Sequence, residues 1–115
     1  MGKFTVFKDR AGEYRFNLKA DSHEIIGQSE GYASKQGAYS GIESVRINAP
    51  YDFRYERFND IRGEYRFRLK AANGEIILAS EGYQSSSGRD NGIESVKANA
   101  PSAPIVENAF LTGAL

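Results

Sequence analysis

The stretch Phe7-Lys-Asp-Arg-Ala-Gly-Glu-Tyr-Arg-Phe-Asn-Leu-Lys-Ala20 returns 51 residues later as Phe58-Asn-Asp-Ile-Arg-Gly-Glu-Tyr-Arg-Phe-Arg-Leu-Lys-Ala71. Between residues 3–50 and 54–101, aligned without a gap, 27 of 48 positions are identical. The chain is therefore a tandem duplication. Solenoids need at least three stacked units, whereas two copies can cover each other about a pseudo-two-fold axis, as the subunits of a C2 dimer do. We expect a monomer that is built like a dimer.

The composition bounds the class of protein. The 115 residues include 15 basic residues, 15 acidic residues and no cysteine. This length fits one domain, and we expect repeats at about 3–53 and 54–108 and a disordered tail at 109–115. Balanced charge argues against a surface that binds polyanions as a whole. The absence of cysteine fits a reducing cytoplasm, and no signal peptide or apolar membrane segment is evident, so we expect a cytoplasmic protein without membrane contact.

Each repeat shows two periodicities. In the first copy, apolar and polar residues alternate from residue 13 to residue 20, which predicts a half-buried strand. Apolar residues then follow at spacings of four, three and four, which predicts an amphipathic helix that begins after Ser34 and ends before Pro50. The stripe consists of Ala38, Ile42, Val45 and Ala49. Each repeat is thus expected to contain three strands, a helix and a closing strand, at 51–58 in the first copy and 104–108 in the second.

Three repeated motifs carry a resemblance. They are F-x-x-x-G-x-[YF]-R-F-x-L-K-A, S-E-x-Y and G-I-x-S-V-[KR]-x-N, at residues 7–20, 29–32 and 41–48 and again between 58 and 99. These motifs resemble the YegP-like family of small bacterial proteins over nearly the whole chain. The resemblance implies an α+β fold, in which two β-β-β-α-β units form one antiparallel sheet with exchanged C-terminal strands and both helices on one face. It implies no established activity.

The open face of such a sheet is the expected interaction surface. With both helices over the side that bears Phe7, Tyr14, Phe16 and Leu18, the polar positions of the second strands face solvent. By alternation, Phe4, Val6, Tyr55 and Arg57 are expected on the same open side. The expected interaction face is formed by Arg15, Asn17, Lys19, Tyr55, Arg57, Arg66, Arg68 and Lys70. Basic residues interleaved with aromatic residues are typical of single-stranded nucleic-acid platforms. A polar face paired with Glu13, Glu56 or Glu64 is also expected of any sheet covered on one side only.

Catalytic chemistry has little support in the sequence. His23, the only histidine, lies in an expected hairpin turn without further metal ligands or a catalytic partner. Ser44 and Ser95 have no histidine placed to activate them. Matched acidic residues, namely Asp9 and Asp60, Glu13 and Glu64, Glu24 and Glu75, Glu30 and Glu81, and Glu43 and Glu94, are expected to be solvated. Ser34 and Ser85 could offer a helix N-terminus to an anion, but helix capping explains both.

We therefore predict a non-enzymatic binding or accessory module without a catalytic, cofactor or metal site. It would engage a macromolecule, with a protein as the first candidate, through the open sheet face. The alternative is single-stranded nucleic-acid binding by that face, and the third hypothesis is a small ligand-binding or hydrolytic enzyme. A site that occurs only once must use positions where the copies differ, and the first to consider are His23 against Gly74, Tyr39 against Asp90, and Val6 against Arg57.

Overall fold

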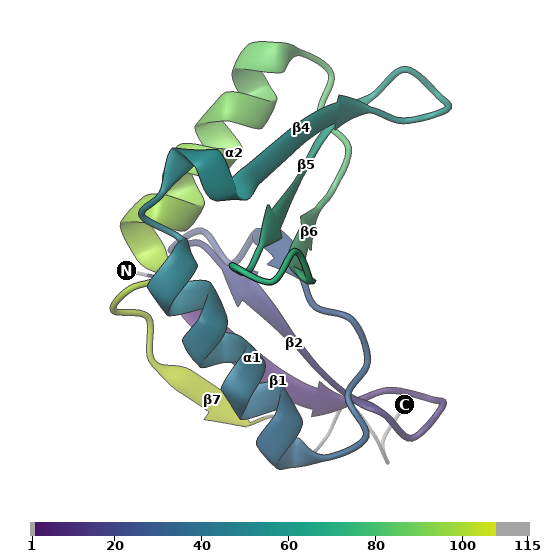
Figure 1. Cartoon of the computed structure of the whole chain (residues 1–115), viewed down its shortest axis with the longest axis vertical. Coiled ribbons are helices and arrows are strands. Elements are labelled where there is room, and N and C mark those ends of the chain that lie inside the picture. Colours follow the sequence, from purple (N-terminus) through teal and green to yellow (C-terminus); the bar gives the residue numbers. More distant parts are fainter. Residues whose placement is uncertain (1, 108–115) are drawn as a thin grey trace.

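The structure, a computed structural model, describes residues 2–107 (Figure 1). The expected disordered tail, residues 109–115, lies outside this range. The elements in chain order are β1 (Lys3–Lys8), β2 (Tyr14–Lys19), β3 (Ile25–Gln28), α1 (Lys35–Asn48), the 3-10 helix η1 (Asp52–Arg54), β4 (Tyr55–Asn59), β5 (Tyr65–Lys70), β6 (Ile76–Ser80), α2 (Ser86–Asn99) and β7 (Ile105–Glu107). These elements reproduce the strand and helix order expected for each repeat.

The strands form one sheet in the order β4-β5-β6-β3-β2-β1-β7. β3 pairs with β6 at the centre, where the two repeats meet about their pseudo-two-fold axis. The predicted α+β fold with a single sheet and two helices is confirmed. The sheet is mixed rather than wholly antiparallel, because β7 runs parallel to β1 whereas the other described pairings are antiparallel.

Both helices lie on one side of the sheet and begin at the expected serines (Figure 1). The side chain of Ser34 accepts a hydrogen bond from the Gly37 amide, and Ser85 does the same for Gly88. These bonds satisfy amides that the first helical turn would otherwise leave unpaired. The predicted stripe of α1, Ala38, Ile42, Val45 and Ala49, is fully buried. Aliphatic side chains thus hold each helix on the sheet.

The core corrects the expected positions of the first strands. Phe4 lies directly opposite Leu18, and Val6 lies opposite Phe16. Residues that face each other across two antiparallel strands point to the same side of the sheet. Phe4 and Val6 are therefore buried under the helices, although the open face was expected for them. Phe7 pairs with Arg15 and lies on the open side, which is also the reverse of the expectation.

The second repeat shows the same error at two residues of the expected interaction face. Tyr55 pairs with Leu69, and Arg57 pairs with Phe67, so both point to the helix side. Tyr55 is buried, and its hydroxyl donates a hydrogen bond to the Ala49 carbonyl at 2.7 Å. The prediction that Tyr55 and Arg57 belong to the open face was wrong, because alternation within a strand does not fix its register against its neighbour.

The predicted exchange of C-terminal strands is present. The chain leaves α1 and enters β4, which pairs with β5 of the second repeat. After α2 the chain returns as β7 to the outer edge of β1, where the Phe4 amide donates to the Pro104 carbonyl at 2.8 Å. The end of the second repeat thus completes the half of the sheet formed by the first, and β4, which follows α1 in the chain, is the first strand of the second half.

Candidate interaction surfaces

Two matched arginines mark the open face of the sheet. The Nε of Arg15 donates to the Asp9 carboxylate at 2.6 Å, and one of its terminal nitrogens donates to the Ser29 carbonyl at 3.2 Å. Arg66 repeats both contacts with Asp60 and the Ser80 carbonyl. Each arginine lowers the pKa of its aspartate through this hydrogen bond. Charge-assisted bonds of this kind fix the direction of a guanidinium group, so both side chains have set orientations on the open face.

The cations of the second repeat are also paired. Arg68 and Lys70 both reach the Glu56 carboxylate, at 3.2 and 3.3 Å. The Arg68 guanidinium lies 4.0 Å from the centre of the Phe58 ring, which it covers from the open side. These pairs are exposed to water and contribute little to folding stability. The single carboxylate of Glu56 thus offsets one of the two positive charges of Arg68 and Lys70.

The first repeat differs at the corresponding positions. Thr5 and Asn17 lie opposite each other on the open side, only 3% and 7% exposed. Among residues 2–107, the Thr5 hydroxyl and the Asn17 carbonyl oxygen have no hydrogen-bond partner. Of the six cations expected on the face, Lys19 is the one without a carboxylate at ion-pair distance in the part of the chain that the structure describes. The neutral pair of Thr5 and Asn17 thus stands where the second repeat has the ion pair of Glu56 and Arg68.

A shallow hollow of about 360 Å³ lies where β3 meets β6 on this face. Arg15 and Arg66 line it from the two repeats, together with Glu30 and Glu81. The side chain of Gln28 donates to Glu81 at 3.0 Å across the junction. The structure thus brings together two of the predicted face residues, Arg15 and Arg66, around the pseudo-two-fold axis.

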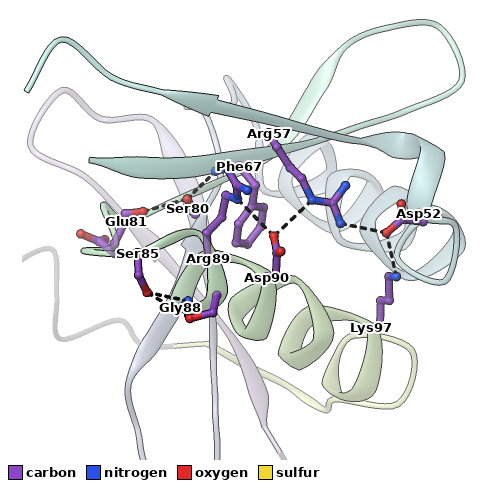
Figure 2. Close-up of polar contacts among 11 residues, drawn as sticks. Asp52, Arg57, Phe67, Ser80, Glu81, Ser85, Gly88, Arg89, Asp90 and Lys97 are labelled. Carbon is purple, nitrogen blue, oxygen red and sulfur yellow. Dashed lines mark hydrogen bonds and ion pairs between the residues drawn. The ribbon is translucent and has the colours of Figure 1, made fainter. Parts of the chain in front are cut away.

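The network around Arg57 explains two of the positions where the repeats differ (Figure 2). Arg57 lies between Asp52 and Asp90 and donates to both carboxylates, at 3.0 and 3.3 Å. Lys97 of α2 adds a second donor to Asp52 at 3.0 Å. The hydrogen bond from Arg57, followed by that from Lys97, lowers the pKa of Asp52 to about 2. This network closes the helix side of the β4 edge.

The first repeat uses the matching positions to hold β7. Tyr39, which matches Asp90, donates its hydroxyl to Glu107 at 2.6 Å, and Lys35 reaches the same carboxylate at 3.2 Å. At the other edge, the Tyr55 amide is satisfied by the Asp52 carbonyl of η1 instead of by an added strand. At these positions the first repeat thus contacts β7, through Tyr39 and through Val6 opposite Glu107. The second repeat instead forms the ion pairs of Arg57 with Asp90 and Asp52 beside β4.

His23 lies in the β2–β3 turn and has a φ of 70°, whereas its counterpart Gly74 has a φ of 87°. Left-handed backbone is natural for glycine and is costly for a residue with a side chain. His23 is exposed and lines a cavity of about 710 Å³ between this turn and α2. The difference between His23 and Gly74 thus falls where the first repeat faces the second, away from both sheet edges.

Tyr83, which lines the same cavity, had no predicted functional role. Tyr83 stacks on Phe67 with ring centres 6.5 Å apart, and Tyr32 stacks on Phe16 in the same way at 6.3 Å. The hydroxyl of each tyrosine lies against a helical glycine, Gly92 or Gly41. The signal was present, because tyrosine and glycine recur nine residues apart in both copies.

The remaining candidates have structural roles. The backbone carbonyls of Ser44 and Ser95 accept hydrogen bonds from Asn48 and Asn99 one turn later in each helix. Residues 2–107 contain no group of three or more histidine, aspartate or glutamate side chains arranged to hold a metal ion. Within the same range, no helix is both long and apolar enough to cross a membrane.

These features define a two-repeat α+β protein with one layer of helices and an open sheet face. The repeats match, at residues 9–56 and 60–107, the family described as Domain of unknown function (DUF1508). A UPF0339 protein encoded in the 5′ region of the ptx operon of Stutzerimonas stutzeri is 48% identical over 92% of this chain and 96% of its own length. The UPF0339 protein YegP of Escherichia coli K12 is 44% identical over 93% and 97%. The chain belongs to the UPF0339/YegP family.

Solved structures agree with this assignment. The solution structure of Escherichia coli YegP has a TM-score of 0.90 at 44% identity, and the match covers 94% of this chain and 93% of YegP. A UPF0339 protein of Shewanella oneidensis has a TM-score of 0.89 at 39% identity, over 95% and 92%. The predicted family is confirmed. YegP is described as a protein of unknown function, so the resemblance fixes the fold and leaves the activity open.

Proposed function

We propose that this chain is a non-enzymatic binding module that docks a partner protein on its open sheet face. The observation that carries the proposal is the charge pattern of that face, where Arg15 and Arg66 are held by aspartates around a central hollow and Glu30 and Glu81 lie beside them. A surface that carries both acidic and basic side chains complements a protein surface with the opposite arrangement, because each charge of one surface then meets an opposite charge on the other. Within residues 2–107, both helices lie on the other side of the sheet.

A nucleic-acid partner has weaker support. Affinity for a polyanion comes from cations that displace counterions from phosphates, and the arginines of the face already have carboxylate partners. Base stacking needs exposed aromatic rings, but Tyr55 is buried on the other side and Arg68 covers Phe58, which leaves the half-buried ring of Phe7 on the open side.

The proposal includes a monomer in the cytoplasm. Its support is that neither edge strand offers a long free edge: β7 has three described residues, and in β4 the Tyr55 amide is bonded to the Asp52 carbonyl beside the charged Arg57. Short edge strands and charged residues on an edge disfavour strand pairing between chains. The lack of cysteine in the sequence supports a reducing compartment.

Site-specific photocrosslinking tests the proposal. A photoreactive residue at Gln28, exposed on the open face, is expected to capture one defined partner from the source cells, and Lys19→Glu should reduce the yield. The matched control places the same residue at Gln36, exposed on α1. The purified partner must then bind the chain directly. Equal products from both positions would overturn the docking face.

A titration with single-stranded DNA and RNA at low salt separates the two candidate functions. A protein-docking face predicts no saturable shifts in the amide resonances of Arg15, Lys19 and Arg66. Saturable shifts that weaken steeply with salt would replace the proposal with the nucleic-acid alternative.

A further inference from the structure

The cavity between the repeats is formed by both copies. Its walls come from the β2–β3 hairpin of the first repeat and from α2 and the segment before it in the second repeat. The volume of about 710 Å³ lies within the range of roughly 300–1,000 Å³ that is typical of small-molecule sites. The polar groups on its walls belong to His23, Glu24, Glu81, Tyr83, Asn91 and Ser95. None of the residues that line it is a lysine or an arginine.

Tyr83 supplies a neutral phenol to this cavity. Its ring is fixed by the stack on Phe67, and its hydroxyl lies against Gly92. No hydrogen bond from this hydroxyl to another residue of the described chain is present. Burial, followed by the negative charges of Glu24 and Glu81, raises the pKa of Tyr83. The hydroxyl therefore stays protonated at neutral pH and offers its oxygen as an acceptor.

Glu24 and Glu81 reach the cavity from different repeats. Glu24 follows His23 in the hairpin, and Glu81 follows β6. Neither carboxylate forms an ion pair within residues 2–107, and Glu81 accepts one hydrogen bond, from the Gln28 amide. Arg66 lies near Glu81 on the side of the open face, but the cavity itself is lined by two carboxylates and a phenol oxygen and by no lysine or arginine.

The same arrangement occurs at the matching position across the pseudo-two-fold axis. Tyr32 lines a smaller cavity of about 330 Å³ with Glu30 of its own repeat and Glu75 of the other hairpin. Burial and the charges of these two glutamates raise the pKa of Tyr32 as well. The twin has Gly74 where the larger cavity has His23. Because the tyrosine, its two glutamates and the helical glycine recur together, the arrangement belongs to the repeat and is not an accident of one loop.

We propose that the larger cavity binds a small organic cation through a primary ammonium group. An ammonium carries three N–H donors, which match the Glu24 and Glu81 carboxylates and the Tyr83 hydroxyl oxygen. His23 and Asn91 line the same cavity and would contact the rest of the ligand. The ammonium can belong to a free amine or to a lysine side chain of another protein. The site shares Glu81 with the hollow of the docking face, whereas His23, Glu24 and Tyr83 lie outside that hollow, so a failure of the docking face leaves this proposal standing.

Amide-shift titrations of the full chain test the site, with n-butylamine, 1,4-diaminobutane and an N-acetyl-lysine amide as probes and 1,4-butanediol as the uncharged control. We expect saturable shifts at His23, Tyr83 and Gly92 with the amines and none with the diol. Loss of a charge-assisted hydrogen bond is worth about 1.5–3 kcal/mol, so Glu24→Gln and Glu81→Gln should each weaken binding by about tenfold or more. Glu43→Gln, an exposed helical control that pairs with Arg46, should leave the affinity unchanged.

The probes also identify the source of the ammonium. Tighter binding of the diamine supports a free amine, and tighter binding of the lysine amide supports a protein side chain. The site is overturned if no amine gives saturable shifts at up to about 10 mM, above the millimolar Kd expected of weak small ligands. Equal binding of the diol, or full affinity in the Glu24→Gln/Glu81→Gln double variant, also overturns it. Both glutamates are exposed, so the variants are expected to fold, and an unchanged urea midpoint checks this.

Discussion

Replacing Gly92 with alanine tests how closely α2 approaches the sheet. A Cβ at this position would meet the Tyr83 hydroxyl, and it would lie 2.8 Å from the Tyr83 ring carbon Cζ and 3.2 Å from Cε2 of Phe67. Tyr83 is stacked on Phe67, and Phe67 is fully buried, so neither ring can move away easily. Alanine should therefore push the helix off the sheet or force the tyrosine out of its stack.

The size of the effect follows from two opposing terms. Alanine in place of glycine inside a helix gains about 1 kcal/mol, and overpacking a filled core costs about 1–3 kcal/mol. The contacts at Gly92 are below van der Waals distance, so the upper part of that range applies. We expect Gly92→Ala to lose about 1–2 kcal/mol in the free energy of unfolding. Gly41→Ala should behave alike, because its Cβ would meet Tyr32 and Phe16 at matching distances.

Urea unfolding followed by circular dichroism measures this loss. The matched control is Gly88→Ala in the same helix, where the Cβ would lie 3.2 Å from the Ser85 hydroxyl and 3.6 Å from the nearest ring atom. Without a clash against a ring, this variant should be as stable as the parent chain or more stable. Tyr83→Phe removes the nearest atom, so it should recover part of the loss when combined with Gly92→Ala. A Gly92→Ala variant as stable as the parent chain would refute the close packing of helix and tyrosine.

Four further predictions follow from the fold. Phe67→Ala should cost about 3–5 kcal/mol because the ring is fully buried, and a loss under about 1 kcal/mol in urea unfolding would contradict its position. Gly74→His should cost about 1 kcal/mol from backbone strain alone, since φ is +87° and no atom lies within 4 Å of a Cβ there; an unchanged urea midpoint would exclude the left-handed turn. A fragment of residues 1–50 should be unfolded by circular dichroism and fold only when mixed with 51–115, because each fragment lacks strands of the other; a stable, monomeric first fragment would contradict the exchange. The lowered pKa of Asp52, about 2 against an ordinary 3.8, stabilises the fold above about pH 4 and stops doing so as the pH falls towards 2; Asp52→Asn should therefore flatten the acid side of the urea-midpoint profile, and an unchanged profile would count against the Arg57 contact.

Much of the fold could be predicted because its signals are local. The strand around Phe16 is indicated by alternating apolar and polar residues, and the helix through Ile42 is indicated by apolar residues three and four positions apart. Each pattern lies within a single segment of the chain. Ser34 and Pro50 mark the ends of the helical segment, and the repeat then doubles each of these signals. Local signals of this kind fix which elements exist and in what order.

The candidate site was harder to predict because it depends on register. The open-face assignment of Arg15 and Arg66 needed only alternation within one strand, whereas that of Tyr55 and Arg57 needed the pairing of β4 with β5. A shift of one residue moves every side chain of a strand to the other face, and the sequence contains no turn signal strong enough to exclude that shift. The cavity at Tyr83 was missed for a related reason, since its glutamates come from different repeats and meet only after the sheet has formed.

The return of β7 to β1 also determines how the molecule resists mechanical force. The strands are parallel, with Phe4 opposite Ile105 and Val6 opposite Glu107, so the start of β1 and the end of β7 point in opposite directions along one seam. A pull applied between the start of β1 and the end of β7 would load the bonds of this seam in shear, all together instead of one after another. The two strands would then separate in one step, together with the hydrogen bonds from Tyr39 and Lys35 to Glu107.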